Sequence, residues 1–147
     1  MRDYMNVERD LQTFLSENGM EDNAEVQAAE VKQFEASRAF TQTRKNHPQL
    51  KELYAENDRL QSEMIDAKVN GNDAKYDAIM EEFKDVRREL ESVARELPEI
   101  QEAQKELQRI TDEVTEVIAS VVESVNAEGK KLADRYRKLH EQFKDMR

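Results

Sequence analysis

The sequence has no cysteine and no tryptophan, and its 147 residues include only three glycines and two prolines. Without cysteine, the chain offers no disulfide, no thiolate nucleophile and no cysteine ligand for zinc or an iron–sulfur cluster. Glycine and proline are too scarce for the turns of a β-sandwich, a barrel or a nucleotide-binding α/β domain. We therefore expect an all-α fold.

Long apolar runs are missing as well. The most apolar stretch, residues 117–122, is far shorter than the roughly 20 residues of a membrane-spanning helix. The amino-terminal residues lack the hydrophobic region of a signal peptide. These absences predict a soluble, cytoplasmic protein with no membrane partner, and the lack of cysteine agrees with a reducing compartment.

Charged residues make up 38% of the chain, and they surround narrow apolar stripes. Apolar residues at steps of three and four predict helices over 3–17, 23–46, from Pro48 to the turn at 70–73, from that turn to Leu97, over 98–126 and over 130–147. In the second of these, Val31 and Phe34 count among the apolar members of a loose pattern. The expected architecture is an antiparallel bundle of long amphipathic helices with coiled-coil-like hairpins.

The predicted helices are separated by short breaks. Asn18-Gly19 is a helix stop, and His47-Pro48 indicates a new helix that begins at the proline. The turn at 70–73 makes a helical hairpin and places Asp73 as the N-cap of the next helix. Periodicity does not decide whether Pro98 kinks or reverses the chain, and we favour a tight reversal; Gly129 is a weak spot in the last helix.

Asn57 lies inside the apolar stripe of its helix. A polar residue in this position can fix the register of a helix pair at a cost in stability. The plainer interpretation, which we favour, is an asparagine whose hydrogen bonds are satisfied or whose side chain is half-exposed.

We find no residue pattern that carries catalysis, and we expect no cofactor and no metal. His47 and His140 lack the spacing of a zinc site; we expect His47 in a loop or capping role and His140 on a solvated face. The carboxylates around Glu81 and Glu89 lack the Glu-x-x-His pairs of di-metal bundles. The chain is therefore expected not to be an enzyme.

Charge divides the chain into an expected helical bundle over residues 1–126 and a basic amphipathic helix over 127–147. The net charge is −10 overall, −13 in the first part and +3 in the second. If the tail binds the phosphates of RNA or the ribosome, its basic residues are the candidates. They are Lys130, Lys131, Arg135, Arg137, Lys138, Lys144 and Arg147. The plainer interpretation pairs them with the acidic body.

The same helix is the candidate surface for a protein partner, because its apolar face can dock on its own chain or on another protein. The candidate partner-binding residues are Arg135, Tyr136, Lys138, Leu139 and Phe143.

Residues 50–125 carry the strongest resemblance to a known family. The helix Tyr76-x-x-Ile79-Met80-x-x-Phe83-x-x-Val86-x-x-Glu89-Leu90 is followed by the break Leu97-Pro98-Glu99-Ile100 and by Ala103-x-x-Glu106-Leu107-x-x-Ile110-x-x-x-Val114-x-x-x-Ile118. Upstream, Phe34-Glu35-x-x-Arg38 corresponds to an earlier helix segment. This order resembles the YlbF/YmcA family, which includes the YheA-like proteins.

The resemblance implies a non-catalytic helical bundle that binds other proteins, as an accessory to RNA processing and developmental regulation. Some members hold iron–sulfur clusters through cysteines, a role that this chain cannot share, and the basic last helix departs from the family pattern. Our leading hypothesis is a helical regulator or adaptor that forms a homodimer. The alternatives are an RNA- or ribosome-associated factor and an acidic mimic of nucleic acid or scaffold.

Overall fold

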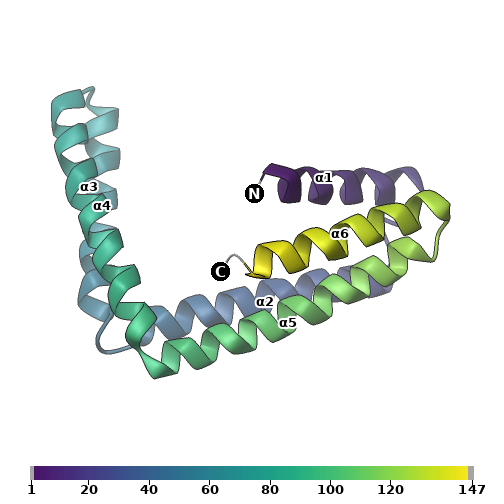
Figure 1. Ribbon diagram of the computed structural model, residues 1–147. Helices are drawn as coiled ribbons and strands as arrows, with labels where there is room; N and C mark the ends of the chain where they lie inside the picture. Colours follow the sequence, from purple (N-terminus) through teal and green to yellow (C-terminus); the bar gives the residue numbers. More distant parts are fainter. Residues whose placement is uncertain (1, 146–147) are drawn as a thin grey trace. The chain divides into compact units, whose positions relative to one another are not determined.

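The computed structural model describes residues 2–145 and folds them into six α-helices (Figure 1). The helices are α1 (Arg2–Glu17), α2 (Ala24–Asn46), α3 (Lys51–Val69), α4 (Asp73–Glu96), α5 (Pro98–Glu123) and α6 (Ala127–Asp145). No strand occurs in this part of the chain, which confirms the all-α prediction. None of these helices has both the length and the apolar character needed to cross a membrane.

The chain forms two compact units, and both divisions between them fall inside a helix. Unit 1 takes its described residues from Met1–Ser37 and Leu107–Arg147, so it contains α1, the first part of α2, the later part of α5, and α6. Unit 2 is Arg38–Glu106 and contains the α3–α4 hairpin.

The core of unit 1 joins the two ends of the chain. α1 lies antiparallel to α6 and packs closely against it (Figure 1). Buried side chains come from all four helical segments; they are Val7, Leu11, Phe14, Leu15, Val26, Ala119, Val121, Val122, Ala133 and Tyr136. On α1, the buried residues recur at steps of three and four, so the predicted stripe is the packing face of that helix.

Gly129 lies in the first turn of α6, close to the end of α5 and to Phe14. Asn126 caps the helix, because its side-chain oxygen accepts a hydrogen bond from the Gly129 amide at 2.9 Å. A Cβ atom at position 129 would overlap the backbone carbonyl oxygen of Val122 and lie 2.9 Å from the Phe14 ring. The glycine thus permits a close approach between the start of α6 and the end of α5.

In unit 2, α3 and α4 form the predicted hairpin. Gly71 ends α3 in the left-handed conformation, with φ of +68°. The N-cap of α4 is Asn72, whose side chain accepts a hydrogen bond from the Lys75 amide at 3.2 Å. The prediction of Asp73 as N-cap is wrong by one residue, because Asp73 already has helical backbone geometry.

A small core forms where α4 ends and α5 begins. Leu50, Ala94, Leu97 and Ile100 are buried in it. Leu97 is extended, with ψ of 119°, and α5 starts at Pro98. The predicted tight reversal is wrong, because α4 packs along α3 and the first turns of α5 leave it at a corner (Figure 1). This bend keeps Leu97 and Ile100 in the same core.

The break at Pro48 also differs from the prediction. α3 begins at Lys51 rather than at Pro48, and residues 48–50 form a turn. The carbonyl of His47 accepts hydrogen bonds from the amides of Leu50 and Lys51, and its ring accepts one from the amide of Gln49. The turn buries Leu50 completely, and the expected loop role of His47 is confirmed.

Asn57 of α3 is only 7% exposed, and its side-chain oxygen has no hydrogen-bond partner among the described residues. The expectation of a satisfied or half-exposed side chain is therefore wrong. A buried carbonyl without a partner loses its hydration and gains nothing in return. Asn57 thus places a buried polar oxygen without a hydrogen bond in the otherwise apolar stripe of α3.

We expect Asn57→Leu to raise the free energy of unfolding by about 1 kcal/mol, because it removes the desolvated oxygen from the seam. Urea unfolding followed by circular dichroism measures the change. Asn70→Leu, at an exposed position beyond the end of α3, is the control and is expected to have a smaller effect. A less stable Asn57→Leu protein, or one with an altered oligomeric state, would instead support a role of Asn57 in fixing register.

Candidate functional site

Three basic residues of α6 form ion pairs within unit 1. Arg135 binds Asp10 of α1 at 2.9 Å. Arg137 binds Glu116 of α5 at 2.9 Å and also contacts Glu123. These hydrogen bonds lower the pKa of Glu116 and raise that of Arg137. The charges of two predicted phosphate-binding residues are therefore compensated inside the unit.

The remaining predicted phosphate-binding residues divide into three groups. Lys130, Lys131 and Lys138 are exposed. Lys144 binds Asp112 of α5 at 2.9 Å. Arg147 lies outside the described residues. Of the six basic residues that the structure describes, three are therefore held in ion pairs and three are exposed.

The apolar residues predicted to bind a partner pack against unit 1 itself. Tyr136 is 6% exposed, and Leu139 packs at the edge of the same core. The ring of Phe143 stacks on that of Tyr4, with centroids 5.2 Å apart. This apolar face of α6 thus docks on its own chain.

His140 and Asp112 form a buried contact between α5 and α6. His140 is 7% exposed, so the prediction of a solvated face is wrong. Its Nε2 atom lies 2.8 Å from one oxygen of Asp112, which also accepts a hydrogen bond from Gln108 at 2.9 Å. Desolvation raises the pKa of Asp112, but the hydrogen bonds from His140, Lys144 and Gln108 outweigh it and lower the pKa to about 2.

The depressed pKa predicts the acid sensitivity of this contact. Because the folded carboxylate titrates below its ordinary value of 3.8, its stabilising effect is present above about pH 4 and is lost as the pH falls through about 2. We expect Asp112→Asn to be less stable than the wild type at pH 5, with the difference shrinking towards pH 2. Urea unfolding of both proteins across this range measures it, with Asp22→Asn in the α1–α2 turn as control. A difference that does not change with pH would contradict the prediction.

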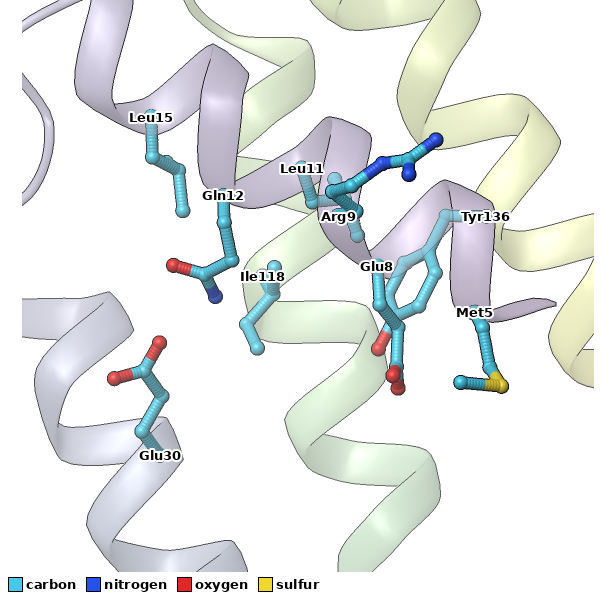
Figure 2. Close-up of a pocket in the computed structure, with 9 residues that line it drawn as sticks. All are labelled: Met5, Glu8, Arg9, Leu11, Gln12, Leu15, Glu30, Ile118 and Tyr136. Atoms are coloured by element: carbon cyan, nitrogen blue, oxygen red, sulfur yellow. The ribbon is translucent and has the colours of Figure 1, made fainter.

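A hollow with both apolar and charged walls lies in unit 1 between α1 and α2 (Figure 2). We call it the α1–α2 groove, and its volume is about 440 Å³. Nine residues line it: Met5, Glu8, Arg9, Leu11, Gln12, Leu15, Glu30, Ile118 and Tyr136. Tyr136 is therefore the one predicted partner-binding residue that contributes to this lining.

Polar side chains face each other across the groove. Figure 2 shows Gln12 of α1 and Glu30 of α2 pointing toward one another, with Ile118 of α5 to one side of them. Glu8 stands on the same wall as Gln12, and its partial burial raises the pKa of its carboxyl group. The groove thus has an apolar floor and acidic groups on both walls.

Large apolar side chains of α1 and α2 remain exposed in unit 1. Met5, in its lining, is 63% exposed, and Phe34 and Val31 of α2 are 67% and 56% exposed. Phe34 follows Glu30 by four residues and so lies on the same side of α2. Val31 lies about 140° around the helix from the buried Val26, because each residue turns an α-helix by about 100°.

A second hollow of unit 1, of about 640 Å³, lies between α2 and α5. Its lining includes Lys32 and Glu113, which form an ion pair at 2.7 Å. Its apolar lining consists of Ala28 and Ala29 from α2 and Val114 and Val117 from α5. With this cation already engaged and no large apolar side chain from α2, it offers less to a partner than the α1–α2 groove.

No group of three or more metal-binding side chains comes together within residues 2–145. No protein-family model, curated protein or solved structure matches the chain. The resemblance to the YlbF/YmcA family therefore stays a prediction.

Sequence reasoning placed the candidate surface on α6 and missed the α1–α2 groove. The available signal was in residues 24–46, where Val31 does not fall on the same helical stripe as Val26 and Phe40. A helix with apolar residues on two sides has more apolar surface than one core can cover. The sequence does not indicate that Glu8 and Glu30 line the same groove, because this depends on how α1 and α2 are arranged.

Proposed function

We propose that this protein is a non-enzymatic helical adaptor or regulator that acts by binding other proteins through the α1–α2 groove. The observation that carries the proposal is the apolar floor of this groove beside the exposed Met5, with the exposed Phe34 one helical turn along α2 from Glu30. Large exposed side chains that cluster beside a concave surface are typical of protein interaction sites. The resemblance to the YlbF/YmcA family adds a role as a cytoplasmic accessory to RNA processing.

Direct binding of nucleic acid through α6 has less support. Arg135, Arg137 and Lys144 form ion pairs with acidic residues of unit 1. Phosphate binding would have to break these pairs, which reduces the gain from counterion release. We also expect the protein to form a homodimer, and sedimentation equilibrium of the purified protein tests this expectation.

Capture of partners from a lysate of the native source tests the proposal. Immobilised wild-type protein is expected to retain specific proteins, and the double variant Met5→Asp/Phe34→Asp is expected to lose them. Ile65→Asp, at a 57% exposed position of α3, is the matched control. Circular dichroism verifies that each variant is folded. A wild-type protein that retains nothing, or a double variant that retains everything, would contradict the proposal.

A further inference from the structure

Unit 1 is open along one side. α1 packs on α6, α6 is joined to α5 by the contacts of Arg137 and His140, and α5 is joined to α2 by the Lys32–Glu113 ion pair. Between α1 and α2 lies the groove instead of a closed helix pair. Leu11, Ile118 and Tyr136 reach its lining from three different helices. An additional helix would therefore find apolar contacts from several sides.

The length of the groove sets the length of its occupant. Its lining on α1 extends from Met5 to Leu15, a distance of about 15 Å along the helix axis. A segment of about three helical turns matches this distance. Apolar side chains at steps of three and four would face the floor, as in other complexes in which a helix occupies a groove.

The charges around the groove determine which charge the polar face of a bound helix should carry. Glu8 and Glu30 stand on opposite walls, and Arg9 is the one basic residue in the lining. Residues 2–37 as a whole carry nine acidic and three basic side chains. A second copy of this acidic segment would meet like charge in the groove, whereas a basic segment would meet opposite charge.

We infer that the α1–α2 groove binds an amphipathic helix of a partner protein whose apolar stripe is flanked by lysine or arginine. The inference rests on the proposed function and specifies its partner class. The apolar stripe covers the floor and the exposed Met5, and the basic side chains approach Glu8 and Glu30 from the two edges of the helix. The raised pKa of Glu8 is consistent with a carboxylate that gains from such a neighbour.

A synthetic helical peptide tests the partner class. The probe is a fluorescent peptide of about three to four turns, with leucine at steps of three and four and lysine elsewhere. The comparison peptide carries glutamate in place of every lysine. Fluorescence anisotropy with the full chain is expected to show binding of the lysine peptide and at least about tenfold weaker binding of the glutamate peptide.

Charge-reversal variants locate the binding. Glu8→Lys/Glu30→Lys is expected to weaken binding of the lysine peptide at least about tenfold. The control Glu17→Lys/Glu35→Lys makes the same change in net charge at exposed positions outside the lining, and Glu17 is about half a turn around α1 from Glu8. The control is expected to retain the affinity within about twofold. Circular dichroism melts verify that both variants are folded.

Two outcomes would overturn the inference: equal binding of the two peptides, or equal loss of binding in the Glu8→Lys/Glu30→Lys and Glu17→Lys/Glu35→Lys proteins. Lysate capture separates these results from failure of the proposed function. If native partners are still captured and the Glu8→Lys/Glu30→Lys protein retains them, the adaptor function stands and the basic-helix inference fails. If nothing is captured by the wild type, the proposed function itself fails.

Discussion

Gly129→Ala is expected to lower the free energy of unfolding by about 1–3 kcal/mol, the usual cost of forcing an extra group into a packed site. The added methyl would overlap the backbone carbonyl of Val122 and approach the Phe14 ring. The ring can rotate, but the carbonyl is fixed by α5, so α6 must shift. Urea unfolding measures the change, with Lys130→Ala at the next, exposed position as control.

The sign of this result is decisive. At an exposed position inside a helix, replacing glycine with alanine stabilises a protein by about 1 kcal/mol. Packing and helix propensity thus predict opposite outcomes at Gly129. A more stable Gly129→Ala protein would mean that α6 does not make this close approach to α5.

Leu60→Ala is expected to lower the free energy of unfolding by about 2–5 kcal/mol, because Leu60 is completely buried in the α3–α4 hairpin. The matched control is Ile65→Ala on the same helix, where the side chain is 57% exposed and the expected change is within about 0.5 kcal/mol. Urea unfolding gives both values, and hydrogen exchange shows whether the amides of α3 and α4 lose protection together.

Comparable losses in the two variants would contradict the assignment of faces on α3. Ile65 and Leu60 are both large apolar residues, so only burial distinguishes them. Loss of hydrogen-exchange protection restricted to α3 would show that α4 does not depend on this packing.

The helices and turns were predictable because they depend on residues close in sequence. The apolar stripe of Val7, Leu11 and Phe14 predicted α1, and the turn at Asn70–Asp73 predicted the α3–α4 hairpin. The observed starts of two helices differ from the predicted starts by a few residues, at the Asn72 N-cap of α4 and at Lys51 of α3, because local backbone geometry sets where a helix begins. Periodicity identifies the packing face of a helix, but it does not specify which other helix covers that face.

The candidate site was not predictable for the same reason. His140 looked solvated because its position on a helix says nothing about Asp112, 28 residues earlier in the chain. Phe34 counted as part of a packing stripe, yet no helix of the described chain buries it. Such facts depend on the arrangement of helices in three dimensions.

The pairing of α1 with α6 also has a consequence during synthesis on the ribosome. The Arg135–Asp10 ion pair joins residues separated by 125 positions, whereas the α3–α4 hairpin needs only neighbouring segments. The hairpin can therefore fold soon after it emerges, while α1 waits with its apolar stripe uncovered until α6 has been made. Nascent chains that stall before residue 127 are thus expected to be the form most exposed to chaperones and proteases.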